Sequence, residues 1–150
     1  MRNSPFAEVF FCDDVRREIG GKISVVGIYQ GFMGIAEASA LLPKLVALSL
    51  LDFPPHFEGK ELFIKVRDRD QSIIDVKLVV PPPDADTARE ILAHPDYEKR
   101  CRLTIPIEMI PFEPTNGMSL VVRISCDDFT FESQPLAILG NAFNLPTQAG

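Results

Sequence analysis

The sequence predicts an all-β protein, a two-layer antiparallel β-sandwich of immunoglobulin-like type with about eight strands and one short helix in a connection. Short runs rich in Val, Ile, Leu and Phe recur along the chain, and clusters of Gly, Pro, Asp and Asn separate them. Within these runs apolar residues mostly recur with a period of two, which is the period of a half-buried strand. At 150 residues, the chain fits one domain, residues 1–150, that needs neither metal nor disulfide to fold.

The first predicted hairpin lies in the segment FAEVFFCDDVRREIGGKISVVGIY. Gly20-Gly21 supplies the positive φ angles that a two-residue turn requires. The segment MGIAEASALLPK that follows allows either a short helix or an edge strand before Pro43. Alternating apolar residues predict the inward face of the first strand, provided that it continues through the charged segment. These residues are Ala7, Val9, Phe11, Val15 and Ile19.

The next apolar runs predict a strand, a surface hairpin and an edge strand. LVALSLLDF ends at Pro54-Pro55, and GKELFIKVRD turns into SIIDVKLVV to form a hairpin with one solvated face. In the first strand of this hairpin, Leu62, Ile64 and Val66 are predicted to face inward. RLTIPIEMIPF contains Pro106, which predicts a position at a sheet edge or a bulge. The segments MSLVVRIS and FTFESQPLAIL then predict a last hairpin around Asp127-Asp128.

One helix is predicted, over residues 87–94. Thr87 and Glu90 have the spacing of a capping box, and Pro95 ends the run. We expect this helix to pack over one end of the sandwich.

Charge and cysteine content exclude several settings. The net charge of −6 at pH 7 opposes a general phosphate-binding surface, so no nucleic-acid partner is predicted. No uninterrupted apolar stretch indicates a secretory signal or a membrane span, so no membrane partner is expected. The odd set of cysteines, Cys12, Cys101 and Cys126, has no C-x-x-C pair and predicts a cytoplasmic protein with free thiols.

The segment FFCDDVRREIGGKISVVGIYQGF contains three short motifs, C-D-D-V-R, then G-K-x-S, then G-I-Y. They comprise Cys12, Asp13, Asp14, Val15 and Arg16, then Gly21, Lys22 and Ser24, then Gly27, Ile28 and Tyr29. This signature resembles the opening of a family of small uncharacterised bacterial proteins. The resemblance covers the first fifth of the chain and implies kinship without an activity. The C-terminal NGMSLVVRISCDDFTFESQPLAI is similar to the last hairpin of immunoglobulin-like sandwiches, which implies no function.

The triplet C-D-D occurs twice, at 12–14 and 126–128. One interpretation is a calcium site, because carboxylates of neighbouring loops supply hard oxygen ligands. Strand counting places Asp127 and Asp128 at one end of the sandwich with Asp84 or Asp86, and these four residues are the metal candidates. The favoured interpretation is turn chemistry at Asp127-Asp128, with Asp13-Asp14 ending or kinking the first strand.

A second alternative is an enzyme that uses Cys12 or Cys126 with His56 or His94. It requires a thiol of lowered pKa beside a base, and no local motif supports it. Both cysteines are expected to be buried, both histidines to lie in solvated loops, and no catalytic residue or cofactor is predicted.

Two remaining features concern binding. Lys65, Arg67 and Arg69 alternate along one strand near Phe63, as on a platform for single-stranded nucleic acid. Glu61 and Asp75 are expected to interrupt that face, which favours an ordinary solvated surface. The segment GIYQGFMGIAEASALLP has more apolar residues than a connection normally exposes. The sequence therefore predicts a non-catalytic binding or assembly module whose partner is another protein or, in a homo-oligomer, another copy.

Overall fold

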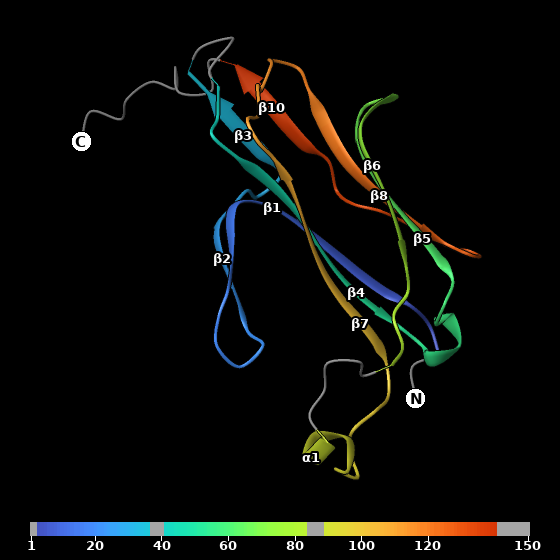
Figure 1. Ribbon diagram of the computed structural model, residues 1–150. Coiled ribbons are helices and arrows are strands. Elements are labelled where there is room, and N and C mark those ends of the chain that lie inside the picture. Colours follow the sequence, from blue (N-terminus) through green and yellow to red (C-terminus); the bar gives the residue numbers. More distant parts are fainter. Residues whose placement is uncertain (1–2, 37–40, 84–88, 141–150) are drawn as a thin grey trace.

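The computed structural model describes residues 3–36, 41–83 and 89–140 of the chain, which fold into two facing β-sheets (Figure 1). The strands are β1 (Phe6–Arg17), β2 (Ile23–Ile28), β3 (Phe32–Ile35), β4 (Leu45–Phe53), β5 (Glu61–Asp68), β6 (Gln71–Val79), β7 (Cys101–Met109), β8 (Ser119–Cys126), β9 (Phe129–Glu132) and β10 (Leu136–Gly140). A 3-10 turn, η1 (Pro55–Phe57), and a short helix, α1 (Arg89–Leu92), complete the described elements.

The two sheets confirm the predicted β-sandwich. Strands β2-β1-β4-β7 form the four-stranded sheet, and β3-β10-β8-β5-β6 form the larger sheet, in which β9 also pairs with β8. All of these pairs are antiparallel except that of β3 with β10, which is parallel. Strand β2 thus ends one sheet and β3 ends the other.

Two segments explain why ten described strands replace the expected eight. The connection after Gly31, for which the sequence allows a short helix or an edge strand, contains the edge strand β3. Residues 37–40 lie outside the described ranges. The last predicted strand divides into β9 and β10 around 133–135, because Pro135 lacks the backbone donor that a continuous ladder requires.

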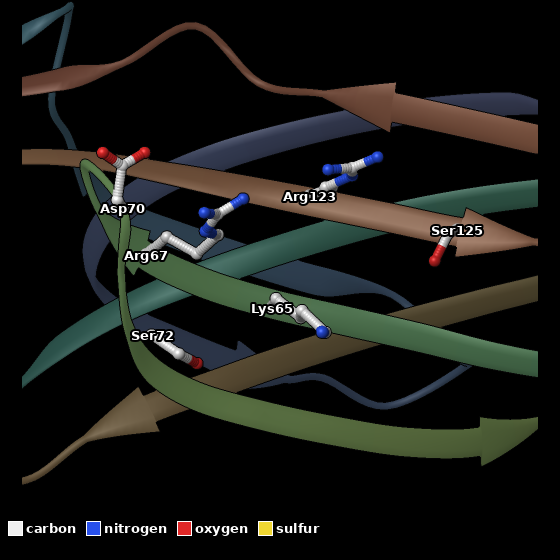
Figure 2. Close-up of a pocket in the computed structure, with 6 residues that line it drawn as sticks. All are labelled: Lys65, Arg67, Asp70, Ser72, Arg123 and Ser125. Carbon is white, nitrogen blue, oxygen red and sulfur yellow. The ribbon is translucent and has the colours of Figure 1, made fainter.

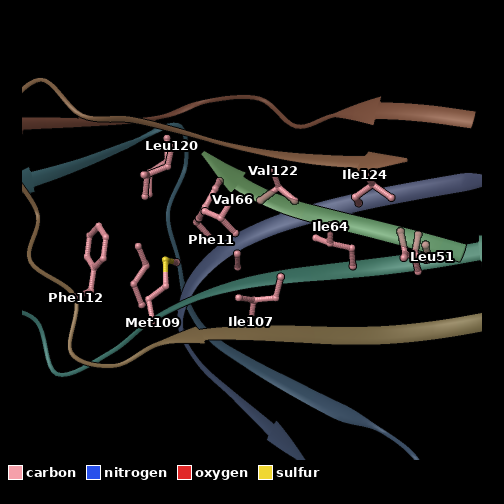
Figure 3. Packing of buried hydrophobic residues seen from close by; sticks show 14 of the residues in the cluster. Phe11, Leu51, Ile64, Val66, Ile107, Met109, Phe112, Leu120, Val122 and Ile124 are labelled. Atoms are coloured by element: carbon pink, nitrogen blue, oxygen red, sulfur yellow. The ribbon is translucent and has the colours of Figure 1, made fainter. Parts of the chain in front are cut away.

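The core lies between the sheets. The predicted inward residues of β5, Leu62, Ile64 and Val66, have no exposed surface. Apolar residues of β1, β4, β7 and β8 contribute to the same cluster, as Figure 3 shows. Ala7, Val9 and Phe11 belong to this face of β1, as predicted.

A smaller apolar cluster lies on the other face of the four-stranded sheet, where Cys12, Val46 and Leu48 are fully buried. Val15 and Val25 of the β1–β2 hairpin pack against it. Strand β1 pairs with β4 up to Cys12 and with β2 from Cys12 onward. Figure 1 shows the blue β1 bending where it leaves β4. The hairpin therefore folds across the outside of this sheet.

This arrangement corrects the predicted inward face of β1. Val15 contributes to the outer cluster, and Ile19, which is 96% exposed at the hairpin end, contributes to neither. The alternation does not continue as one face because the strand changes its partner and its direction at Cys12.

The predicted helix ends earlier than expected, and its described part does not pack over the sandwich. Helix α1 has four described residues and none is buried; His94 lies beyond it, and Thr87 lies outside the described residues. Ile91 is 50% exposed, since so short a helical segment has no apolar stripe to bury. Within the described ranges, no helix is long and apolar enough to cross a bilayer.

Candidate functional site

Residues of the N-terminal signature contact one another at the position where β1 changes its partner strand. We call the contacts among Asp13, Gly27 and Tyr29 the signature lock. The Tyr29 hydroxyl donates a 2.6 Å hydrogen bond to Oδ1 of Asp13. Gly27 has a φ of +67°, and a Cβ there would lie 2.1 Å from Oδ2 of Asp13. Glycine is thus required twice at this position, for its conformation and for the space that the carboxylate occupies.

The second aspartate of the signature makes a separate set of ion pairs. Lys44 Nζ lies 2.5 Å from Oδ1 of Asp14, and Arg16 Nε lies 3.2 Å from Oδ2. The hydrogen bond from Lys44, followed by that from Arg16, lowers the pKa of the Asp14 carboxyl. The ion pair between Asp14 and Lys44 connects β1 to the residue that precedes β4.

The remaining signature residues shape the hairpin. Gly20 and Gly21 both have positive φ, 84° and 76°, as predicted for this turn. Lys22 accepts a backbone hydrogen bond from Glu18 through its carbonyl group, and Ser24 lies opposite Arg16 in the β1–β2 register. Each part of the signature therefore has a structural role in the hairpin.

The second C-D-D triplet is the β8–β9 turn, as predicted. Asp127 has a φ of 56°, and its carboxylate accepts a 2.6 Å hydrogen bond from Lys60. Asp68 lies at the other end of β5, where it accepts a hydrogen bond from the Ser119 amide. The two triplets thus have different partners and do not form one cage.

The metal candidates are only partly described. Asp84 and Asp86 lie outside the described residues, and Asp127 is engaged by Lys60. Within 3–36, 41–83 and 89–140, no group of three or more His, Cys, Asp or Glu side chains is placed to hold a metal ion.

All three thiols are buried and free of disulfides, as expected for Cys12 and Cys126. Burial, with a smaller contribution from Asp13, raises the pKa of the Cys12 thiol. Burial also raises the pKa of Cys126. Both shifts are opposite to the activation that a cysteine nucleophile needs.

The histidines occupy exposed connections, as predicted. His56 lies in η1, where its ring packs against Phe57 with centroids 4.7 Å apart. His94 follows α1 and accepts a hydrogen bond from the backbone amide of Asp96.

The four outermost strands differ in how they are protected against pairing with another chain. At one end of each sheet, β6 contains Asp75 and Lys77, and β7 contains Arg102, Pro106 and Glu108. Pro106 therefore lies in an edge strand, as predicted. At the other ends, β2 (ISVVGI) and β3 (FMGI) contain no charge and no proline. Charged residues and proline are common means of blocking an exposed edge, and these two strands have neither.

The β2–β3 edge, defined by residues 23–28 and 32–35, also exposes apolar side chains. Val26 is 44%, Ile28 48% and Phe32 56% exposed. Leu139 of the neighbouring β10, which pairs with Gly34, is 45% exposed. Among the described strands none pairs with the outer side of β2 or of β3, so the edge combines unpaired backbone groups with exposed apolar side chains.

The basic face is not made of all the residues that the sequence pattern predicted. Lys65 and Arg67 line a shallow depression of about 520 Å³ on the outer face of the larger sheet, together with Arg123 of β8. Arg69 belongs to the β5–β6 turn, where it has a φ of 52° and donates to the carbonyl of Gly117. Asp75 lies opposite Lys65, as expected for an interrupted face.

Arg123 was missed because it joins the cluster through the β5–β8 pairing, which connects strands far apart in the sequence. A run of alternating cations marks only one strand and does not identify its neighbour.

No protein family, curated protein or solved structure matched the chain. The resemblance of its opening segment to a bacterial family therefore stays a prediction.

Proposed function

We propose that this protein is a non-catalytic assembly module that associates with a second copy of itself through the β2–β3 edge. The observation that carries the proposal is the contrast between the strands that end the two sheets: charges and proline protect β6 and β7, while β2 and β3 have neither. An edge strand left without such protection is a template for another strand.

The exposed side chains give this edge a reason to associate. Val26, Ile28 and Phe32 are each exposed by more than two fifths. Burial of apolar area contributes about 25 cal/mol per Å², and backbone pairing adds hydrogen bonds and register. Pairing of one edge with its own copy in antiparallel orientation is compatible with a two-fold axis, the commonest symmetry of oligomers.

The signature lock supports this proposal indirectly. The hydrogen bond between Asp13 and Tyr29 and the close approach of Asp13 to Gly27 connect β1 to β2 and to the start of the β2–β3 connection. An edge held rigidly loses less conformational entropy on pairing. The kinship with small bacterial proteins and the cytoplasmic location belong to the same proposal, and the three buried cysteines, which form no disulfide, agree with that compartment.

The two alternatives have less support. Calcium-dependent docking requires carboxylates free to bind the ion, whereas Lys60 engages Asp127. A thiol enzyme requires an accessible thiolate, whereas burial raises the pKa of Cys12 and Cys126.

Size-exclusion chromatography with light scattering tests the proposal over a range of concentrations. The expected mass is about twice the 16.7 kDa of the chain. Val26→Lys and Phe32→Lys place a charge on the edge and should give the monomer. Val79→Lys is the matched control, since Val79 is 59% exposed on the opposite edge strand, β6, and should leave the mass unchanged. A monomer at every concentration, or equal effects of all three substitutions, would contradict self-association.

A further inference from the structure

The outer face of the larger sheet places three cationic side chains side by side. Figure 2 shows Lys65 and Arg67 along β5, Arg123 and Ser125 on the adjacent β8, and Asp70 and Ser72 near the β5–β6 turn. The residues that alternate with them in both strands are fully buried, so these side chains point away from the core.

The register places two of these cations directly opposite each other. Lys65 lies directly opposite Arg123 in the β5–β8 ladder, and Arg67 follows two residues along the same face. Like charges in directly opposed positions of a sheet destabilise it. Within the described residues, no carboxylate lies within 4.0 Å of the charged groups of these three side chains.

Carboxylates lie next in register without forming an ion pair with the cluster. Asp75 lies opposite Lys65 on β6, where its Oδ1 accepts a 2.9 Å hydrogen bond from Ser72. Glu132 lies opposite Arg123 on β9. The cations thus form a small basic area between two acidic positions, on a chain with a net charge of −6.

We propose that Lys65, Arg67 and Arg123 bind a single phosphate group, either free phosphate or the terminal phosphate of a small phosphorylated molecule. Guanidinium groups donate paired hydrogen bonds to phosphate oxygens, and a lysine adds a point charge. Ser125, which lines the same depression, is a further donor. Bound phosphate removes the repulsion between the opposed cations.

The surrounding acids decide between this ligand and a nucleic acid. A polyanion extends over several phosphates and needs a basic track. Here Asp75 and Glu132 flank the basic row, and Asp70 is the one carboxylate among the residues that line the depression. The area accommodates one phosphate and repels the next.

Titration of the isotope-labelled protein followed by NMR tests this proposal, with phosphate, phenyl phosphate and a single-stranded oligonucleotide as separate ligands, each compared with chloride at equal ionic strength. Phosphate should shift the signals of 65, 67 and 123 and saturate. Tighter binding of phenyl phosphate than of phosphate identifies an organic phosphate as the ligand class, and the reverse identifies free phosphate. Stronger binding of the oligonucleotide than of both, or no effect beyond that of chloride, would overturn the proposal.

Substitutions distinguish phosphate binding at this site from a general effect of the net charge of the protein. Lys65→Gln and Arg123→Gln should each weaken phosphate binding about tenfold, since each removes a charged donor. Arg17→Gln changes the net charge equally on the exposed end of β1 and should leave binding unchanged. Asp70→Asn should strengthen it. Without phosphate, Lys65→Gln should melt no lower than the parent protein, because it relieves like-charge repulsion. If Arg17→Gln weakened phosphate binding equally, the effect would be explained by net charge alone. That result would contradict the proposed site.

Discussion

The hydroxyl of Tyr29 donates a 2.6 Å hydrogen bond to the carboxylate of Asp13, sixteen residues earlier in the chain. This contact connects the strand that changes sheet partner to the segment that leads into the other sheet. Gly27 makes room for it, since any side chain there would collide with Asp13. The three residues act as one unit that fixes the bend of the β1–β2 hairpin.

Gly27→Ala is expected to destabilise the fold by about 2 to 4 kcal/mol, because the new Cβ displaces Asp13 and the left-handed backbone is strained. Chemical denaturation measures the change. Gly59→Ala is the control, since Gly59 has a φ of +80° with no atom within 4 Å of its Cβ position, and it should cost only about 1 to 2 kcal/mol. Equal losses in the two variants would refute the role assigned to the contact with Asp13.

The environment of Tyr29 leads us to predict that the fold loses stability at alkaline pH. Burial, and then the hydrogen bond to Asp13, raises the pKa of Tyr29 in the folded protein. A group whose pKa is raised by folding contributes stability that is fully present below its unfolded pKa, about 10 for tyrosine, and is lost as the pH rises further. Denaturation from pH 8 to 11 should therefore show a steeper alkaline loss for the parent protein than for Tyr29→Phe. With only two tyrosines in the chain, Tyr97→Phe is the control, and a parallel loss in parent and Tyr29→Phe would contradict the assignment.

We predict that substitution of Arg100, which lies outside the signature, strongly destabilises the fold. Its side chain is 4% exposed, pairs with Asp52 through Nε at 2.5 Å and donates to the carbonyl of Ser4. Arg100→Met leaves a carboxylate without its buried partner and should cost about 3 kcal/mol in urea denaturation. Arg102 approaches the same aspartate at 3.8 Å but is 49% exposed, so Arg102→Met should cost less than about 1 kcal/mol. A ranking in which Arg102→Met costs more would show that burial does not set the strength of these pairs.

The thiols provide a test against the enzymatic alternative. Cys12, Cys101 and Cys126 are at most 1% exposed, and accessible thiolate is the form that reacts. A disulfide reagent added to the native protein should label all of them slowly, and in denaturant all of them quickly. Rapid reaction of one thiol in the native protein would contradict this prediction and support the enzymatic alternative.

The sequence predicts much of this fold because local pattern determines local structure. Alternation identified the inward residues of β5, such as Leu62 and Ile64, and paired glycines identified the first turn. It did not predict the exchange of partners at Cys12, since alternation shows that two faces exist without showing which sheet covers each. The end of α1 at Leu92 was not predicted either, since it depends on packing contacts that this exposed segment does not make.

The candidate surfaces were predicted only in part, for the same reason. The apolar character of the segment after Gly27 indicated a covered surface, but the contrast between protected and unprotected edges requires the strand order. Likewise Lys65 and Arg67 stood out along one strand, whereas Arg123 became their neighbour only through the β5–β8 register.

Amide hydrogen exchange as a function of protein concentration tests the assembly claim most directly, because it reports on the backbone groups that would pair between copies. Amides of Ile23–Ile28 and Phe32–Ile35 should become slower to exchange as concentration rises, while those of β6 should not change. Exchange at β2 and β3 that is independent of concentration, in a protein whose mass is that of the monomer, would contradict the account.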